Sequence, residues 1–440
     1  MGVRVTGGAL EDALNFLFAR TTGGFKFGLE RTFALLDALG NPHRAYPVIH
    51  VAGTNGKGSS LATAEALLLG SGRGMRVGKY TSPHLVDFRE RILVDRVPID
   101  ADAVVEFVER RTPLVEKLGA TFFEATTALA FDAFARANVD VALIETGLGG
   151  RLDSTNVVEP LVAGVTTIGW DHMEYLGHTL DAIALEKAGI FKRGRPAVIG
   201  ERSPDIRAVL SERAKELGAI PLVVADSVSV EDIEVSGSDG GGIGGGTAAT
   251  FEMHGERARL HTPLAGRHQA FNLAFTLALL DEAGPDYRFT LGQAAPLLDQ
   301  ISLPGRFQRT GNYIFDVAHN ADGARVLAET LRAVRPPGPV RALFCALRDK
   351  EWEEMLRTLE PVIDEFVLTN APTAPASRSW DLEQAREFLV RNGLAGEVVL
   401  PFESALRRVE QAGSGTIVVT GSFHTVGDAM ACLHVSPFAP

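Results

Sequence analysis

Cysteine is nearly absent from this sequence, and long uninterrupted apolar stretches are missing altogether. The 440 residues include only Cys345 and Cys432, which lie far apart and without metal-ligand spacing. A disulfide scaffold is therefore excluded, and a reducing compartment is expected. No apolar run approaches the length that spans a bilayer. Near the N-terminus, Glu11, Asp12 and Asn15 interrupt the apolar residues, so no secretion signal is expected and the protein is predicted to be cytoplasmic.

A block of basic residues is also missing. Lysine and arginine number 43 against 55 aspartates and glutamates, which gives a formal net charge of −12. Such a field repels nucleic acid and anionic membranes, so neither is an expected partner. Small anionic substrates would need local cationic sites. Hydrophobic residues make up 45% of the chain, and its length suggests two domains or three.

The stretch His50–Ser59, HVAGTNGKGS, carries the most pointed chemical signal in the chain. It follows an apolar, strand-like run and precedes a run with helical periodicity. Gly53, Gly56 and Gly58 would let backbone N–H groups approach an anion, while Lys57 could reach terminal phosphates. The spacing departs from the common G-x-x-x-x-G-K-[ST] pattern, because an extra glycine separates the lysine from the serine. The stretch predicts a phosphate-binding loop, with a merely structural turn as the alternative.

Four apolar runs, each ending in polar or glycine-rich residues, indicate strands of one parallel sheet. They cover residues 47–52, 76–80, 139–144 and 161–168, and helical segments separate them. Such runs are typical of strands buried on both faces. Parallel strands place their carboxyl ends at one edge, so a site is predicted there. The chain is therefore expected to be an α/β protein whose N-terminal domain is a P-loop-type, parallel-sheet ATPase domain.

A second, smaller domain is predicted beyond the Leu303-Pro304-Gly305-Arg306 segment, which interrupts the helical pattern. Strand-like runs alternate there with helical stretches, which predicts a Rossmann-like α/β domain. We place the domains at residues 1–302 and 303–440, with the reaction in the cleft between them. Residues 236–247, SGSDGGGIGGGT, are the only low-complexity segment and are expected to form a flexible surface insertion.

A series of motifs resembles, in its order, the folylpolyglutamate synthase and dihydrofolate synthase family, within the Mur-type ligases that use ATP. The match extends over almost the whole chain. It rests on FGLER at Phe27–Arg31, HVAGTNGKGS, TSPHL at Thr81–Leu85, RERI at Arg89–Ile92, ETGLGGRLDSTN at Glu145–Asn156, DH at residues 171 and 172, EKAGI at Glu186–Ile190, HQxxN at His268–Asn272, LPGRFQ, DxAHN and TGSFHTVGD.

The resemblance implies ATP-dependent amide formation, in which a substrate carboxylate takes the γ-phosphoryl group and the amine of L-glutamate attacks the acyl phosphate. The acceptor would be dihydropteroate, a reduced folate or both, and the implied cofactors are ATP and Mg²⁺, as two ions. Catalytic roles would fall to Lys57, Lys187 and His172. The implied nucleotide-binding residues are Gly53, Thr54, Asn55, Gly56, Lys57, Gly58, Ser59, Asn272, Arg306 and Asp316.

Ser82, Glu145 and His172 match the magnesium ligands of the family. Lys187 matches a lysine that the family carries as a CO₂-derived carbamate, which would make it an anionic metal ligand. By themselves, these residues allow simpler interpretations. Lys187 could be a surface lysine in a last helical turn, Glu145 could cap a neighbouring helix, and the Asp171-His172 pair could be a turn.

Six further residues match substrate-binding positions of the family. The pterin end of the acceptor would lie at Thr121, Phe123, Asp153 and Ser154, and glutamate would lie at His319 and Ser422. Phe123 could equally be a core residue, and His319 a hydrogen-bonded structural histidine. Ser154 stands where the family often has alanine.

Two other interpretations stay open. Another Mur-type ligase, such as one that extends a cell-wall nucleotide precursor, would need an additional N-terminal domain, yet the phosphate loop here begins by residue 53. A catalytically silent nucleotide-binding protein should have lost at least one of Lys57, Glu145, His172 and Lys187. A monomer is expected, because two domains of one chain would surround the cleft.

Overall fold

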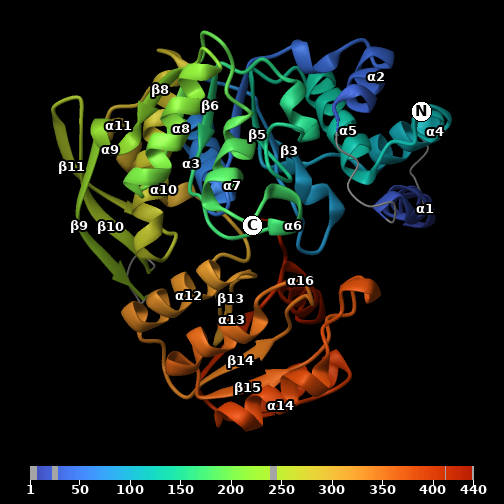
Figure 1. The fold of residues 1–440 in the computed structure, drawn as a ribbon, viewed down its shortest axis with the longest axis vertical. Coiled ribbons are helices and arrows are strands. Elements are labelled where there is room, and N and C mark those ends of the chain that lie inside the picture. Colours follow the sequence, from blue (N-terminus) through green and yellow to red (C-terminus); the bar gives the residue numbers. More distant parts are fainter. Residues whose placement is uncertain (1–6, 22–27, 238–244, 412, 439–440) are drawn as a thin grey trace.

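The computed structural model describes residues 7–21, 28–237, 245–411 and 413–438. An eight-stranded sheet with helices on both faces forms the larger part of the molecule, and a six-stranded sheet with its own helices lies below it in Figure 1. Phe27 of the FGLER motif and residues 238–244 of the glycine-rich segment lie outside the described residues. Within those ranges, no helix is both long and apolar enough to cross a membrane.

The large sheet is parallel except at one edge. Strands β3 and β4 pair antiparallel with their neighbours, and the other six strands run in one direction. In spatial order the strands are β4 (Val97–Pro98), β3 (Ile92–Val94), β2 (Val77–Tyr80), β5 (Val141–Glu145), β1 (Val48–Ala52), β6 (Val162–Val165), β7 (Pro196–Ile199) and β8 (Ile220–Val223).

Helices bury both faces of this sheet, and every residue of β1 and β5 is buried. One face packs against α3 (Lys57–Gly70), α10 (Arg267–Ala283) and α11 (Leu291–Ala294). On the other face lie α4 (Ala101–Leu118), α5 (Phe122–Ala137), α7 (Leu180–Ala188) and α8 (Pro204–Glu216). Helices α1 (Gly7–Phe18) and α2 (Glu30–Ala38) pack on α4 and α5. The short helices of this part are α6 (Met173–Leu176) and α9 (Val224–Ser227). Burial on both faces explains why the strands read as continuous apolar runs.

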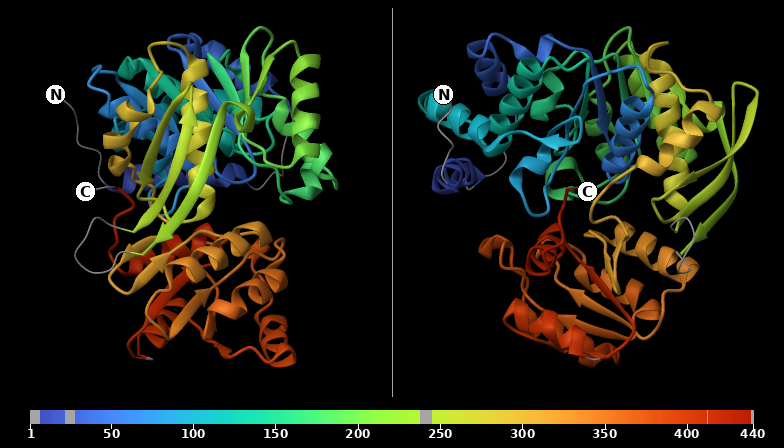
Figure 2. Two further views of the ribbon diagram at one scale, coloured as in Figure 1. Left: turned by 90° about the vertical axis from the view of Figure 1, so that its left-hand side faces the viewer. Right: turned by 180° about the vertical axis from the view of Figure 1, so that it is seen from behind.

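A three-stranded antiparallel sheet flanks α10. It consists of β9 (Val228–Ser236), β10 (Gly246–Met253) and β11 (Glu256–Thr262), with β10 in the centre. Figure 2 shows these strands reaching down the side of the large sheet towards the second sheet. The segment predicted as a surface insertion thus connects two strands, and its ends, Ser236 and Gly246-Thr247, belong to them.

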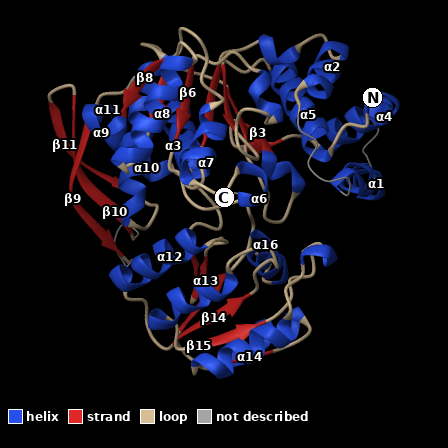
Figure 3. Cartoon of the chain, viewed as in Figure 1, coloured by secondary structure: helices blue, strands red, loops and turns tan. Residues whose placement is uncertain are grey.

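The six-stranded sheet contains the remaining strands, in the order β12 (Gln308–Thr310), β13 (Tyr313–Phe315), β17 (Thr416–Thr420), β14 (Val340–Phe344), β15 (Glu365–Leu368) and β16 (Gly396–Val398). Only β12 is antiparallel. One face of the six-stranded sheet packs against α12 (Ala321–Val334), α13 (Trp352–Leu359) and α14 (Leu382–Asn392). The other face packs against α15 (Phe402–Gln411) and α16 (Phe423–Cys432). Figure 3 shows the same arrangement of helices around central strands in both parts.

The predicted α/β class with two domains is confirmed, and β2, β5, β1 and β6 are adjacent and parallel as expected. Their carboxyl ends therefore meet at one edge. The antiparallel strands β3 and β4 and the sheet β9–β11 were not predicted. The division between residues 302 and 303 stays a prediction, and the strands of the six-stranded sheet begin at Gln308.

Candidate active site

The loop between β1 and α3, residues 53–56, leads from the carboxyl edge of the sheet into a helix of 14 residues. Gly53 and Gly56 have φ values of +151° and +92°. A Cβ atom on Gly53 would lie 1.8 Å from Thr166 Oγ1, and one on Gly56 would lie 2.6 Å from Asn272 Oδ1. Backbone conformation and close neighbours therefore both require glycine. The free N–H groups and the dipole at the start of α3 favour a phosphate here.

Hydrogen bonds from the end of β6 anchor this loop. Thr166 Oγ1 and Thr167 Oγ1 donate to the Asn55 carbonyl oxygen over 2.7 and 3.1 Å. The Gly169 N–H donates to Thr54 Oγ1 over 3.0 Å. The loop conformation is thus fixed by the neighbouring strand, so little reorganisation is needed when an anion binds.

Lys57 folds back over its own loop. Its Nζ donates to the carbonyl oxygens of Gly53 and Thr54 over 3.0 and 3.2 Å. The same ammonium lies 3.7 Å from Glu145 Oε1. The positive charge therefore lies between the loop and a carboxylate, where it would meet a phosphate held by the loop.

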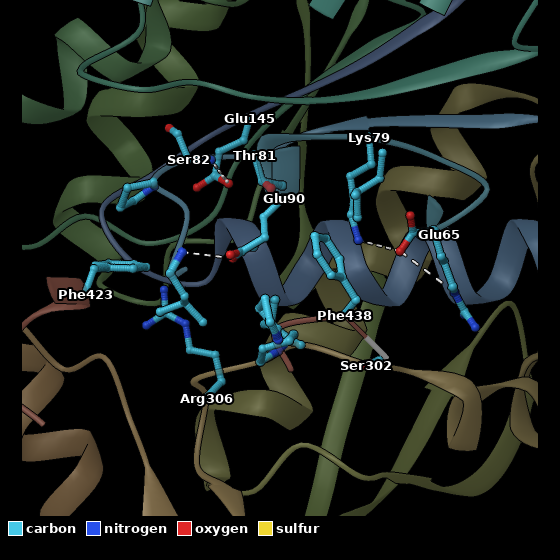
Figure 4. A pocket seen from close by; sticks show the side chains of 18 residues that line it. Glu65, Lys79, Thr81, Ser82, Glu90, Glu145, Ser302, Arg306, Phe423 and Phe438 are labelled. Atoms are coloured by element: carbon cyan, nitrogen blue, oxygen red, sulfur yellow. Dashed lines mark hydrogen bonds and ion pairs between the residues drawn. The ribbon is translucent and has the colours of Figure 1, made fainter. Parts of the chain in front are cut away.

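Glu145 and Ser82 follow β5 and β2, and they lie close together at the carboxyl edge. The Ser82 N–H donates to Glu145 Oε2 over 3.4 Å. Burial raises the pKa of Glu145, although the charges of Lys57 and Arg306 act against this rise. Both residues line a cavity of about 110 Å³. Figure 4 shows them on one side of it, with Arg306 and Phe423 approaching from the other.

Ser82 and Glu145 offer oxygen atoms, which are the ligands that Mg²⁺ prefers. His172, whose φ is +52°, places Nε2 3.8 Å from Asp171 Oδ2 and does not line this cavity. Across the described ranges, no three His, Cys, Asp or Glu side chains converge as a metal-binding group. A magnesium site here would use few protein ligands, with waters and phosphate oxygens completing the shell, as is common for this ion. The oxygen donors fit Mg²⁺, and a ligand role for His172 stays a prediction.

Lys187 is buried at the end of α7, with 5% of its surface exposed, and its Nζ donates to the Gly53 carbonyl oxygen over 2.9 Å. It is therefore not a surface lysine, and it contacts the same loop as Lys57. Burial, with a smaller contribution from the Lys57 charge, lowers the pKa of Lys187 to about 7. An amine with such a pKa is largely uncharged in mildly alkaline solution, and only an uncharged amine can react with CO₂.

Of the predicted nucleotide-binding residues outside the phosphate loop, Asn272 lies beside that loop, and Asp316 lies near the segment that joins the two domains. Asn272 is adjacent to Gly56 and donates from Nδ2 to Gln269 Oε1 over 2.9 Å. Asp316 accepts the backbone N–H groups of Phe307 and Ala318, each over 2.9 Å.

Arg306 lies over the ring of Phe423, 5.4 Å from its centroid. Burial raises the pKa of Asp316 and lowers that of Arg306, while their mutual attraction opposes both shifts. Arg306 thus brings a desolvated positive charge to the cavity that Glu145 lines.

Asp171 joins the two parts of the molecule. Its Oδ1 lies 2.5 Å from Lys350 Nζ, and its Oδ2 lies 3.5 Å from both His319 Nε2 and Asn320 Nδ2. Burial alone would raise the pKa of Asp171, but the His319 hydrogen bond and the charges of His172 and Lys350 hold it well below its usual range. A carboxylate of the large domain thus neutralises the Lys350 ammonium of the small one.

Sequence reasoning missed Lys350 and the part that Asp171 plays here. The signal was present, because Arg348-Asp349-Lys350 closely follows the buried strand β14 at the carboxyl edge of the small sheet. Polar residues at that position are the same pattern that led to Ser82 and Glu145.

The predicted acceptor residues lie around the loop that follows β5. A Cβ atom on Gly147 would lie 2.4 Å from Phe123 Cζ, so the Phe123 ring packs flat on this glycine. Asp153 is buried, and it accepts the N–H groups of Gly147 and Leu148 over 2.9 and 2.8 Å. Ser154 follows it in a buried 3₁₀ turn. Asp153 therefore orders this loop, and its role towards a substrate stays a prediction.

The other predicted substrate residues also have structural partners. Thr121 caps α5 and exchanges hydrogen bonds with Glu124. Ser422 caps α16 by accepting the Thr425 N–H over 3.1 Å. His319 donates from Nδ1 to the Val317 carbonyl oxygen over 3.0 Å, which leaves Nε2 facing Asp171. Substrate roles for these three stay predictions.

Comparison with known proteins identifies the family. The Mur ligase middle domain matches residues 51–280, and the glutamate ligase domain of Mur ligases matches residues 305–423. A protein of Bacillus subtilis named dihydrofolate synthase/folylpolyglutamate synthase is 33% identical over 436 residues, which are 96% of this chain and 98% of that one.

Two solved structures share the fold over their whole length. Mycobacterium tuberculosis folylpolyglutamate synthase complexed with ADP is 32% identical and superposes with a TM-score of 0.87, covering 98% of this chain and 99% of that one. A bifunctional folylpolyglutamate synthase/dihydrofolate synthase with Mn, AMPPNP and L-glutamate bound is also 32% identical, with a TM-score of 0.79 over 96% and 98% of the two chains. With both Mur ligase domains matched and relatives that are 32–33% identical over nearly the whole length, this chain belongs to the folylpolyglutamate synthase and dihydrofolate synthase family of ATP-dependent Mur-type ligases.

Proposed function

We propose that the protein joins the amine of L-glutamate to a carboxylate of dihydropteroate or of a reduced folate, with ATP as the energy source. The observation that carries this proposal is the cavity that Ser82 and Glu145 line together with Arg306 of the small domain, with Lys57 Nζ 3.7 Å from Glu145 Oε1. One relative with the same fold binds ADP, and another binds L-glutamate together with Mn and AMPPNP.

In this reaction the acceptor carboxylate attacks the γ-phosphorus of ATP, and ADP leaves. The N–H groups at the start of α3 would hold the phosphates, and Lys57 would neutralise the charge that develops on them. A divalent cation at Ser82 and Glu145 would supply Lewis-acid stabilisation of the phosphoryl oxygens. The glutamate amine then attacks the acyl carbon and inorganic phosphate leaves.

A carbamate on Lys187 is part of the proposal. Its formation joins the uncharged amine to CO₂ and releases one proton. The pKa of about 7 supports this step, because much of the Lys187 amine is then uncharged near neutral pH. The resulting anion would stand beside the loop that binds phosphate. In a Lys187→Ala variant, a short carboxylic acid should restore part of the lost turnover, and a complete failure of this rescue counts against the carbamate.

The acceptor is tested by measuring phosphate release from ATP with glutamate and one acceptor at a time. Dihydropteroate, tetrahydrofolate and a uridine nucleotide precursor of the cell wall form the three arms. We expect release with the first, the second or both, and none with the third. Release only with the uridine precursor would indicate another Mur-type ligase, and nucleotide binding without any release would indicate a catalytically silent protein.

Two further features complete the proposal. We propose a monomer, because the cleft residues of both domains come from one chain, and light scattering of the purified protein tests this. The scarcity of cysteine supports the predicted cytoplasmic location.

A further inference from the structure

His50 is a buried polar residue to which the proposed reaction gives no role. It lies in the middle of β1 with none of its surface exposed, three residues before the phosphate loop. Its Nε2 lies 2.8 Å from Thr155 Oγ1, and the Thr155 hydroxyl donates to Asp153 Oδ1 over 2.5 Å. Burial, followed by the Lys192 charge, lowers the pKa of His50 to about 3, so the imidazole is neutral near neutral pH.

The position of each proton in the His50–Thr155–Asp153 series of hydrogen bonds follows from Asp153. Its Oδ2 accepts from Gly147 N and Leu148 N, and its Oδ1 accepts from the backbone N–H of Thr155 over 3.0 Å as well as from the hydroxyl. Four donors leave both oxygens as acceptors, which is the behaviour of a carboxylate. Because the Thr155 hydroxyl gives its proton to Asp153, its oxygen must accept from His50. The Nε2 atom therefore carries the hydrogen of the ring, and Nδ1 has no partner among the described residues.

This hydrogen-bond chain ends on a loop with three functional neighbours. Residues 147–153 begin two positions after Glu145, and Gly147 packs against the Phe123 ring. A Cβ atom on Gly150 would lie 2.6 Å from the Lys187 carbonyl oxygen. A shift of this loop would therefore move the predicted acceptor platform directly, whereas the phosphate loop has its own anchors, Thr166 and Thr167, directly after β6.

We propose that His50 is a positioning residue that acts through Thr155 and Asp153 on residues 147–153, and thereby sets the affinity for the acceptor. This inference rests on the proposed function, because the acceptor is the substrate expected at Phe123. His50 does not touch the substrate. Its donor holds the Thr155 hydroxyl in the orientation that keeps Asp153 on the Gly147 and Leu148 N–H groups.

Steady-state kinetics test this role with a conservative pair of substitutions. His50→Leu removes the donor at similar volume, whereas His50→Gln retains an N–H near the position of Nε2. We expect His50→Leu to raise the KM for the acceptor by roughly fivefold or more, the effect of one lost hydrogen bond, while the KM for ATP stays within about twofold. His50→Gln should recover most of the acceptor KM. Acceptor KM values of wild-type size in a folded His50→Leu variant would overturn the proposal.

His43 is the matched control. It is also buried and neutral, with a pKa lowered to about 4 by burial, but neither of its ring nitrogens has a hydrogen-bond partner among the described residues. His43→Leu should leave the acceptor KM within about twofold of the wild type. Thr155→Val should raise the acceptor KM as His50→Leu does, and the double variant should be no worse than either single one. An equal rise in His43→Leu, or additive effects of His50→Leu and Thr155→Val, would refute the relay.

Nitrogen-15 NMR of the His50 ring separates this inference from the proposed function, because it needs no substrate. We expect the neutral tautomer with hydrogen on Nε2 between pH 6 and 8, the window above a pKa of about 3. Hydrogen on Nδ1 would overturn the relay. If the wild type releases no phosphate with either folate-type acceptor, the proposed function fails, while the tautomer still decides whether the relay exists.

Discussion

Replacing Lys187 by methionine should stabilise the unligated protein in neutral solution, although it should abolish turnover. Burial lowers the pKa of Lys187 from 10.5 to about 7, so the folded state holds the charged amine unfavourably. Each pH unit between the two values corresponds to about 1.4 kcal/mol, so the penalty is about 4 to 5 kcal/mol at pH 6.5 and falls to about 1 kcal/mol at pH 9.5. The hydrogen bond to the Gly53 carbonyl oxygen is also lost, but Lys57 donates to the same oxygen, so this loss is about 1 kcal/mol at most.

The sign of the pH dependence follows from proton counts. Between pH 7 and 10.5 the unfolded wild type binds more protons than the folded one, so its free energy of unfolding rises with pH because of this residue. Methionine does not titrate, so the advantage of the variant should shrink over the same range. Urea unfolding of wild type and variant at pH 6.5 and 9.5, in buffer freed of CO₂, measures the difference in their free energy of unfolding at each pH.

The control for this experiment is Lys215→Met. Lys215 lies on α8 with 62% of its side chain exposed, and substitution there should change the stability little at either pH. A Lys187→Met variant that is less stable than the wild type at pH 6.5, or whose advantage does not fall at pH 9.5, would refute the reasoning.

Four other substitutions test separate parts of the site. Lys57→Met should weaken ADP binding about 10- to 100-fold in calorimetry, because a charged donor to phosphate is lost; unchanged affinity would remove Lys57 from the site. Glu145→Gln should raise the Mg²⁺ concentration for half-maximal turnover about tenfold, and no change would show that it is not a ligand. Gly53→Ala places a Cβ atom 1.8 Å from Thr166 Oγ1 and should lower the melting temperature by several degrees; an unaltered melting curve would contradict the tight packing. Asp171→Asn leaves Lys350 buried without its charged partner and should favour separated domains, which small-angle scattering would detect as an increased radius of gyration and which an unchanged radius would contradict.

The sheet could be predicted because its strands are buried on both faces. Continuous apolar runs ending in polar residues gave β1, β2, β5 and β6, and they also gave the edge at which Ser82 and Glu145 meet. The strands β3 and β4 have only three and two residues, too few for a periodic pattern. The alternation in β9 was present in the sequence and was overlooked.

The site could be predicted where local sequence determines it, and less so where distant residues meet. The glycines of the phosphate loop and the lysine that follows them are contiguous, so their chemistry is visible in a few letters. Lys350 contacts Asp171 across 179 positions of sequence, and His50 contacts Thr155 across 105. Such pairs depend on how the elements pack and not on any local pattern, which is why the sequence did not reveal them. Burial of Lys187 was hidden for the same reason.

The central claim is that an acyl phosphate forms on the acceptor before glutamate attacks it. The most direct measurement uses dihydropteroate or tetrahydrofolate labelled with oxygen-18 in the carboxylate, together with ATP and glutamate, and mass spectrometry of the phosphate released. Attack by the carboxylate on the γ-phosphorus transfers one labelled oxygen to each phosphate, so we predict one label per phosphate and one amide per ADP. Phosphate without label, or ADP formed without amide, would contradict the account.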